Sequence, residues 1–377
     1  MPAHVRACLT VASAASVLVV ASVTLWAGQG PAAGAKAAPA KPAEKASTIA
    51  RTPWGDPDLQ GTWTTDSAFG IPLQRPPQFA GRADLNDAEF AQKVERDTRT
   101  RTAAENAVGS FRGDGAWLTK SFRQTSLIVE PADGTLPPLT PEAERKRALA
   151  PRGTYGDGPF DGPEDFTMYD RCLTLGVVGS MTPKIYGNGH RIVQGPGYVA
   201  IMNEMIHETR LIPLDGRPHP GRNIQMYMGD GRGHWEGQTL VVETTNLNGR
   251  TNYSGVDMKL VERITRVEPD VLRYEATIDD PKTYTRTVKI SIPLTSPPGY
   301  QVLPYECHEG NRALLQALSG ARAEDRALEE DLKKGIVRAR TPVQNGLSVG
   351  GARIGEPGPG GAAAGAPPPA AATPPAR

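Results

Sequence analysis

The sequence predicts a mainly β fold, an antiparallel meander that forms a barrel or a strongly curled sheet, with an irregular N-terminal half and a C-terminal helix. Two observations carry this prediction. Between His190 and Leu294, β-branched and aromatic segments alternate with turn residues, a pattern typical of successive strands. Short connections such as Leu214-Asp215-Gly216 favour antiparallel neighbours, because parallel strands need long crossovers.

The first 35 residues read as a secretory signal peptide. Arg6 is their single charged side chain, an apolar and small-residue run follows from Ala7 to Ala27, and Ala33-Gly34-Ala35 offers a small-x-small cleavage site. The alternative is an uncleaved anchor, which the many Ser, Thr and Ala residues of the run disfavour. We therefore expect export to the periplasm or the extracellular space, without a membrane span after cleavage.

The charge balance excludes one class of partner. The chain carries 42 Lys and Arg against 41 Asp and Glu, and loss of Arg6 with the signal peptide would bring the formal charge to zero. Both signs are scattered along the chain, whereas a nucleic-acid-binding protein would favour a basic face. No nucleic-acid partner is expected, and no feature of the sequence indicates an oligomeric state.

Two cysteines, Cys172 and Cys307, remain after removal of the signal peptide. In an oxidising compartment such a pair is most simply read as one disulfide, and the alternative is two buried free thiols. Closing a loop of this length would stabilise the fold by about 4 kcal/mol in the chain-entropy model.

Composition divides the chain into a folded part and two flanks. An Ala/Pro/Lys-rich linker and a Gly/Pro/Ala-rich tail hold too little apolar content to bury a core and are expected to be disordered. The folded part reads as one β-rich domain. The boundaries are 1–35 for the signal peptide, 36–50 for the linker, 51–345 for the domain (51–171 irregular and helical, 172–310 meander, 311–335 helical) and 350–377 for the tail.

The N-terminal half of the domain contains turns, extended pieces and two expected helices. The first runs from Asp87 to about Thr102, with Asn86 as N-cap and Glu89 three residues later, as in a capping box. The second covers residues 141–148 and begins with Pro141, whose missing N–H costs nothing at the first helical position. This half is expected to wrap around the meander.

The meander follows in seven expected segments, which read RIVQGPGYVAIMN, ETRLIPLDG, NIQMYMGD, HWEGQTLVVETTNL, KLVERITRVEPD, VLRYEATIDDP and TYTRTVKISIPL. Leu240, Val242 and Thr244 share one face of their segment, and Val288 and Ile290 alternate with polar residues. A period of two with one apolar side predicts one packed face and one wet face. A helical segment from 311 to 334 closes the domain, broken near its glycine at 320 and stopped by the glycine at 335.

Two features resemble known proteins. Gly61-Thr62-Trp63 in DLQGTW resembles the Gly-x-Trp of the first strand in lipocalin-like, or calycin, barrels, although some hundred residues separate it from the meander. The segments QTSLIVEPADGTLPPLTPEAE, YDRCLTLG, GYVAIMNEMIHETRLIPLDGRPH, GHWEGQTLVVETTNL and YECHEGN are similar to a large group of exported bacterial proteins that are mostly described as hypothetical. That resemblance covers most of residues 51–325. It implies a secreted β-rich protein and supplies no activity.

Candidate catalytic residues lie in the segment MNEMIHETR. An unbroken strand would place Asn203 and His207 on an otherwise apolar wall, whereas a turn at Glu204-Met205-Ile206 would place the ionisable residues at a hairpin tip. Either geometry could bring His207 close to Glu204 or Glu208, as an acid/base pair that titrates near neutral pH. The alternative is a histidine satisfied by a neighbouring strand or by solvent.

Candidate ligand-binding residues surround this segment in the sequence. The glycine-rich GDGRGHWEG leads into a strand rather than a helix, so a phosphate loop is disfavoured. Its polar residues could instead line the mouth of a pocket, with an arginine meeting an anion and a tryptophan either stacking on a ligand or packing in the core. The expected set is Tyr198, Met202, Asn203, Tyr227, Asp230, Arg232, His234 and Trp235.

No cofactor or metal is expected. The five histidines of the mature chain do not form the helical zincin spacing, and the acidic loop GDGPFDGPEDF does not match an EF-hand. Nucleophile elbows, Walker loops and dinucleotide fingerprints are also absent from the sequence. The favoured hypothesis is a protein that binds a small, partly apolar molecule in the barrel. The alternatives are a metal-independent lyase, isomerase or hydrolase, and a cell-surface structural protein.

Overall fold

The computed structural model describes residues 50–106, 117–148, 160–184, 186–251, 255–303 and 305–339. The expected signal peptide, all but the last residue of the linker and the C-terminal tail lie outside the described residues and stay predictions.

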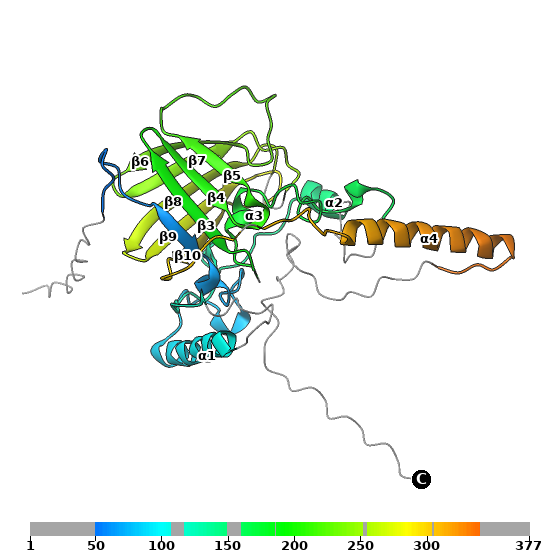
Figure 1. The fold of residues 1–377 in the computed structure, drawn as a ribbon, viewed down its shortest axis with the longest axis horizontal. Coiled ribbons are helices and arrows are strands. Elements are labelled where there is room, and N and C mark those ends of the chain that lie inside the picture. Colours follow the sequence, from blue (N-terminus) through cyan, green and yellow to red (C-terminus); the bar gives the residue numbers. More distant parts are fainter. Residues whose placement is uncertain are drawn as a thin grey trace, which may run out of the picture. The chain divides into compact units, whose positions relative to one another are not determined.

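The described residues form one antiparallel sheet (Figure 1). Its strand order is β5-β4-β3-β1-β10-β9-β8-β7-β6, and β2 pairs with β10. The mainly β, antiparallel architecture is thus confirmed. The strands are β1 (Gly61–Thr64), β2 (Ile128–Glu130), β3 (Gly189–Gly195), β4 (Tyr198–Asn203), β5 (Thr209–Pro213), β6 (Asp230–Glu236), β7 (Thr239–Thr245), β8 (Lys259–Glu268), β9 (Val271–Asp279) and β10 (Val288–Thr295).

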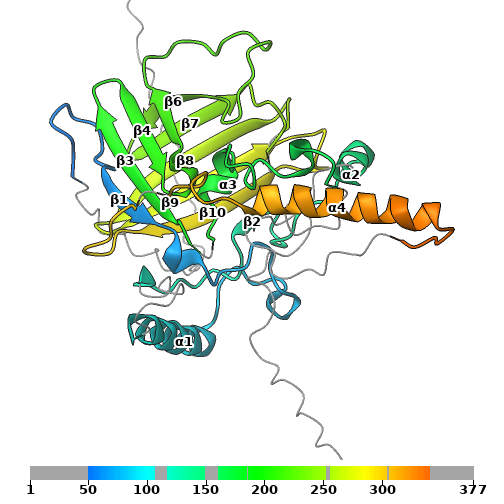
Figure 2. The same cartoon turned by 45° about the vertical axis from the view of Figure 1, so that its right-hand side comes forward.

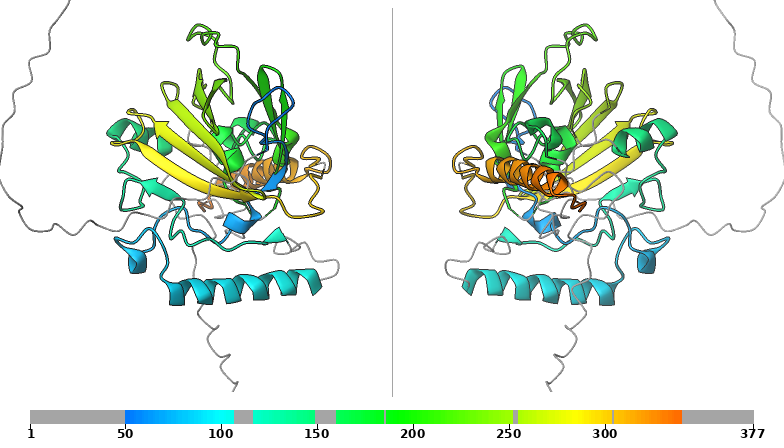
Figure 3. Two further views of the ribbon diagram at one scale, coloured as in Figure 1. Left: turned by 90° about the vertical axis from the view of Figure 1, so that its left-hand side faces the viewer. Right: turned by 90° about the vertical axis from the view of Figure 1, so that its right-hand side faces the viewer.

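The sheet curls until its two edge strands, β5 and β6, lie near each other (Figures 1, 2 and 3). No ladder of hydrogen bonds joins these edges within the described part of the chain. Side chains fill the seam instead, because a Cβ added to Gly233 would lie 2.9 Å from Cγ2 of Ile212 and 2.6 Å from Cδ2 of Leu214. The fold is therefore a curled sheet that hydrogen bonds do not close.

Strand β1 joins the two runs of the meander. Thr64 pairs with Gly189 of β3 on one side and with Thr295 of β10 on the other. The Trp63 side chain is fully buried beneath this join, and its Nε1 donates to the carbonyl of Leu59 at 3.0 Å. The strand that contains the Gly-x-Trp segment therefore connects strands β3 to β5 with strands β6 to β10 in a single sheet.

The inner face of the sheet forms the core, with the period of two that the sequence predicts. On β7, Leu240, Val242 and Thr244 are buried, although Val241 of the opposite face is buried as well. On β10, Val288 and Ile290 are buried while Lys289 is only half-buried. Alternation with one packed face follows from the geometry of a strand, in which successive side chains point to opposite sides.

A buried ion pair crosses this apolar interior. Arg210 of β5 donates to both carboxylate oxygens of Glu262 of β8, at 2.9 and 2.7 Å, and Tyr274 of β9 donates its hydroxyl to Glu262 at 3.0 Å. The Arg210 and Glu262 side chains are 7% and 1% exposed. Because three strands contribute, this network holds the edge strand β5 against the centre of the curl.

The two N-terminal helices begin as the sequence predicts. Helix α1 (Asp87–Asn106) has a capping box, in which the Glu89 N–H donates to Asn86 Oδ1 and the Asn86 N–H donates to Glu89 Oε2, both at 2.9 Å. Helix α2 (Pro141–Ala148) is capped by the hydroxyl of Thr140. A short helix, α3 (Val177–Met181), precedes β3.

Helix α4 (Ala313–Lys333) corrects one expectation, because it runs through Gly320 without a break. Glycine lowers helix stability by only about 1 kcal/mol, and the rest of the helix is rich in Ala, Leu and Glu. Its end is as predicted: Gly335 has φ 75°, and the N–H of Ile336 donates to the carbonyl of Asp331. The chain has no helix among its described residues that is long and apolar enough to cross a membrane.

Two expectations about strands are also corrected. The segment NIQMYMGD forms a single bridge, between Met226 and Leu247, rather than a strand. The Asn246 side-chain amide donates to the carbonyls of Pro220, Gly221 and Ile224, which holds this loop away from an extended conformation. Strand β6 begins at Asp230, four residues before the expected HWEG.

Candidate functional site

A recess of about 380 Å³ lies at one end of the sheet. The pairing of Thr64 with Gly189 and Thr295, and of His190 with Asn203, brings the ends of β1, β4 and β10 together with the start of β3. The recess is lined by residues of the segments that precede β3 and follow β1, β4 and β10, and by Trp117. They are Asp66, Trp117, Tyr186, Gly187, Asn188, Glu204, Gly299, Tyr300, Gln301 and Leu303.

Glu204, the first residue after β4, is a fixed acceptor in this recess. Its Oε2 accepts the Gly189 N–H at 2.9 Å and the Tyr300 hydroxyl at 3.1 Å, and its Oε1 accepts the Leu303 N–H at 3.1 Å. The carboxylate therefore ties the segment after β10 to the start of β3. Of the three residues expected to be catalytic, Glu204 is the one that lines this recess.

Asp66 is the second carboxyl group of the recess and lies two residues after the end of β1. Its Oδ2 accepts the Thr64 hydroxyl at 2.7 Å, and its Oδ1 accepts the side-chain amide of Asn188 at 2.7 Å. Burial raises the pKa of Asp66, and the negative charge of Glu204 acts in the same direction, while the two hydrogen bonds oppose the shift. Ionisation of Asp66 therefore requires more free energy in this recess than it does in water.

The positive charge of Lys184 acts on Asp66 and favours its ionised form, but Lys184 does not line the recess. Its ammonium donates to the carbonyls of Gly179, Ser180 and Thr182 at the end of α3, at 3.2, 2.9 and 2.6 Å. Burial lowers the pKa of Lys184 to about 7, and the charge of Asp66 opposes that shift. Its donors are thus committed to the backbone.

Aromatic rings form the walls. The rings of Trp117 and Tyr300 meet edge to face, with their centroids 5.0 Å apart. Tyr186 stacks on Tyr305 at 6.0 Å. Burial, reinforced by the charges of Asp66 and Glu204, raises the pKa of Tyr300, so its hydroxyl stays a neutral donor at physiological pH.

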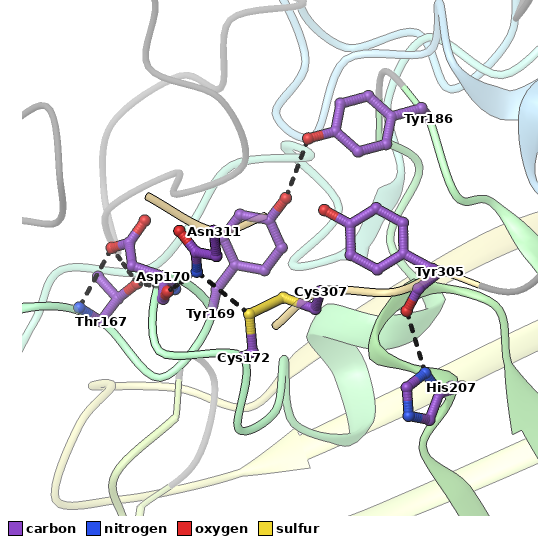
Figure 4. The surroundings of a disulfide bond; sticks show 9 residues. All are labelled: Thr167, Tyr169, Asp170, Cys172, Tyr186, His207, Tyr305, Cys307 and Asn311. Carbon is purple, nitrogen blue, oxygen red and sulfur yellow. Dashed lines mark hydrogen bonds between the residues drawn. A yellow bond between two sulfur atoms is a disulfide. The ribbon is translucent and has the colours of Figure 1, made fainter. Parts of the chain in front are cut away.

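A disulfide lies beside one of these walls (Figure 4). Cys172 and Cys307 are bonded, with their Cα atoms 5.6 Å apart, which confirms the predicted pair and excludes the free-thiol alternative. In Figure 4 the rings of Tyr169, Tyr186 and Tyr305 gather near the bond, and the hydroxyls of Tyr169 and Tyr186 are 3.3 Å apart. The disulfide thus attaches the segment that follows Leu303, a residue of the recess lining, covalently to Cys172.

The chain turns after β4, as one of the two alternatives for MNEMIHETR predicts. Ile206 and His207 both have left-handed backbones, with φ of 63° and 43°, a rare conformation for a β-branched residue. Glu204 therefore faces the recess, while the exposed His207 ring places Nδ1 3.0 Å from the carbonyl of Tyr305 (Figure 4). The His207 N–H donates to the Glu204 carbonyl at 3.0 Å, but their side chains have different partners and form no acid/base pair in the described part of the chain.

Glu208 points elsewhere. It accepts the hydroxyl of Thr174 and lines a second recess of about 350 Å³, at the seam between β5 and β6, together with Tyr227. Burial raises the pKa of Glu208, opposed by the Thr174 hydroxyl and by the charge of Arg210. The expected trio of His207, Glu204 and Glu208 is thus divided between the solvent and two recesses, and its catalytic role stays a prediction.

The expected ligand-binding residues of β4 do not share a surface. Tyr198 is 41% exposed and Met202 is half-buried, whereas Asn203 is buried and its Oδ1 lies 2.9 Å from Nδ1 of His190. Burial, with the charge of Lys184, lowers the pKa of His190 to about 3, so this imidazole is neutral. Asn203 and His190 therefore form a structural pair in the interior.

The expected residues of β6 also have partners within the chain. Arg232 donates to both oxygens of Asp230, at 2.8 and 2.9 Å, and Nδ1 of His219 lies 2.6 Å from the same carboxylate. His234 is exposed and lies 3.2 Å from Glu236. Trp235 packs against the core, one of the two roles that the sequence predicts for it. Ligand binding by this group stays a prediction.

Sequence reasoning missed Asp66, Asn188, Tyr300 and Trp117. Asn188 directly precedes β3, and Asp66 and Tyr300 lie two and five residues after the ends of β1 and β10. Antiparallel pairing gathers such positions at one end of a sheet. Placing the Gly-x-Trp strand next to β3 would have brought Asp66 to Glu204. Trp117 carries no comparable signal, because the contact that defines its position is made with Tyr300, far along the chain.

Replacement of Gly189 by Ala is expected to disturb the recess. A Cβ there would lie 2.5 Å from Oε2 of Glu204 and 3.0 Å from the hydroxyl of Tyr300. Overpacking of this kind costs about 1–3 kcal/mol, and urea denaturation followed by tryptophan fluorescence would measure it. Gly70→Ala is the control, because nothing lies within 4 Å of a Cβ at that position. Equal stability of the two variants would contradict the packing argument.

The described residues contain no group of three or more His, Cys, Asp or Glu side chains that could hold a metal ion. Comparisons with known proteins found no matching family model, no matching curated protein and no matching solved structure. Function therefore has to be argued from the chemistry of the site.

Proposed function

We propose that this chain is an exported protein that binds a small, partly apolar molecule in the recess at the end of the sheet. The observation that carries the proposal is the combination, in one recess, of the aromatic residues Trp117, Tyr186 and Tyr300 with two acceptors, Asp66 and Glu204. Binding sites for small molecules typically combine apolar walls with a few oriented polar groups, in volumes of roughly 300–1,000 Å³.

The rigidity of the recess supports binding. Glu204 is held by three donors, and the disulfide and the stacking of Tyr305 on Tyr186 restrain the neighbouring segment. Groups that are ordered before a ligand arrives reduce the entropy lost on binding. A hydrolase, lyase or isomerase that uses a His/Glu pair is the weaker alternative, because His207 bonds a backbone carbonyl instead of a carboxylate.

The compartment that we infer is the periplasm or the extracellular space. The features of residues 1–35 that are typical of a signal peptide support this inference, and so does the disulfide, since such bonds persist in oxidising compartments. We also propose that the sheet is a calycin-like barrel with a side-chain seam between β5 and β6, and that the chain belongs with the exported bacterial proteins that it resembles. The Gly-x-Trp strand at the join supports the first of these proposals.

Native mass spectrometry of the exported protein tests the binding function. We expect a small molecule to be retained by the wild type and lost from Gln301→Trp, because a large ring at position 301 would occupy the recess that Gln301 lines. Gln238→Trp, on the exposed turn between β6 and β7, is the matched control and should retain the molecule. Retention of the same molecule by Gln301→Trp would contradict the assigned site. Turnover of the identified molecule would favour the enzyme alternative.

A further inference from the structure

We propose that the recess selects organic cations, in particular a protonated amine carried on a partly apolar body. This inference rests on the proposed binding function and adds the chemical class of the ligand. It is carried by the charge of the lining, by the free acceptor capacity of one carboxylate and by the aromatic walls.

The lining is acidic without an internal counterion. Its two ionisable carboxyl groups belong to Asp66 and Glu204, and the other lining residues include no Lys, Arg or His. Lys184 acts on Asp66 through space, but all three carbonyls that its ammonium contacts belong to the backbone around α3. The two carboxylates would therefore repel an anion in this recess, whereas a bound cation would supply the counterion that the lining lacks.

The two carboxylates differ in what they can still accept. A carboxylate offers about four acceptor positions. Glu204 uses three of them on Gly189, Tyr300 and Leu303. Asp66 accepts one donor on each oxygen, so it keeps room for further N–H donors. A charge-assisted bond from an ammonium to Asp66 would be about twice as strong as a neutral one.

The rings add attraction for the same class of ligand. A cation within about 6 Å of the face of a Trp or Tyr ring is attracted by the negative face of the ring quadrupole. The recess has three such rings, from Trp117, Tyr186 and Tyr300. They also provide apolar area for a hydrocarbon or aromatic body, which a hydrated metal ion would not use.

Ionisation of Asp66 should couple to binding. Asp66 faces Glu204, the hydroxyls of Thr64 and Tyr300, the amide of Asn188 and the charge of Lys184. Burial and Glu204 raise its pKa, and a bound cation would favour the ionised form. Affinity for an amine should therefore increase as the pH rises through the pKa of Asp66 in the free protein, while affinity for a neutral analogue should change little.

A matched pair of probes tests the inference on the full exported chain. Calorimetry would compare 2-phenylethylamine with 2-phenylethanol, which has nearly the same shape, at about pH 8, where the amine is still protonated. We expect at least about tenfold tighter binding of the amine at low salt, with the preference shrinking as ionic strength rises. Asp66→Asn should remove most of the preference and leave the alcohol unaffected.

The control is Glu236→Gln, which removes an exposed carboxylate on β6 and the same formal charge, and should keep the preference. Equal binding of the two probes by the wild type would overturn the cation inference and leave the binding function standing. Binding of neither probe, together with an empty recess in native mass spectrometry, would overturn both. The salt and pH series on the wild type keep the test valid if Asp66→Asn does not fold.

Discussion

Replacement of Glu262 by Gln is expected to lower the free energy of unfolding by about 3–5 kcal/mol, because it leaves the buried guanidinium of Arg210 without a counterion. The substitution keeps the size of the side chain, so the cost reports the charge rather than a cavity. Equilibrium urea denaturation of the disulfide-bonded protein, followed by tryptophan fluorescence, would measure it.

The geometry explains why the effect should be large. The Glu262 side chain is 1% exposed, and it accepts both arms of the guanidinium and the hydroxyl of Tyr274. Removing one partner of a buried pair leaves the other charge desolvated. Since Arg210 lies on the edge strand β5, release of its side chain should also loosen the seam beside Gly231 of β6.

Two further variants test this explanation. Glu243→Gln breaks the surface ion pair between Glu243, which is 41% exposed, and Lys259, which is 51% exposed. It should lower the free energy of unfolding by less than about 1 kcal/mol. The double variant Arg210→Met with Glu262→Leu should recover most of the stability, because apolar residues of similar volume can replace a buried ion pair. If the double variant is no more stable than Glu262→Gln, the loss of stability comes from disrupted packing of these side chains and not from the unpaired charge.

Local patterns predict the sheet well, because each strand records its two faces in its own sequence. The alternation in TLVVETTNL and in TVKISIPL, and the turn residues between the segments, are local signals of this kind. The Arg210–Glu262 pair gives no such signal. Arg210 reads as an ordinary polar residue of ETRLIPLDG, and its partner is 52 residues away on a strand that is not its neighbour in the sheet.

The candidate site shows the same division. Glu204 was predicted because a turn after β4 places ionisable residues at the rim. Its partners were not, since Tyr300 is 96 residues further along the chain and meets Glu204 through the antiparallel order of the strands. The outward direction of His207 depends on the left-handed backbone at Ile206, a conformation that propensity alone disfavours for a β-branched residue.

Removal of the disulfide by Cys172→Ala with Cys307→Ala is expected to lower the free energy of unfolding by about 4–5 kcal/mol. The bond closes a loop of 135 residues, and in the chain-entropy model such a loop restricts the unfolded chain strongly. Urea denaturation of the wild type and the double variant would measure the loss. Treatment of the wild type with a reductant should produce a comparable loss, since it breaks the same bond without changing a side chain.

The same variant separates a global effect from a local one. If the bond acts only on the unfolded chain, hydrogen exchange near Tyr305 and Asn311 in the folded protein should equal that of the wild type. We expect faster exchange there, because the other contacts of this segment include solvent-exposed hydrogen bonds. Nδ1 of His207 lies 3.0 Å from the Tyr305 carbonyl, and the Asn311 amide donates to the carbonyl of Asp170, beside the stack of Tyr305 on Tyr186. Leu303, two residues before Tyr305, lines the recess. A weaker affinity for 2-phenylethylamine should therefore accompany the faster exchange, whereas unchanged affinity with faster exchange would separate the disulfide from the binding site.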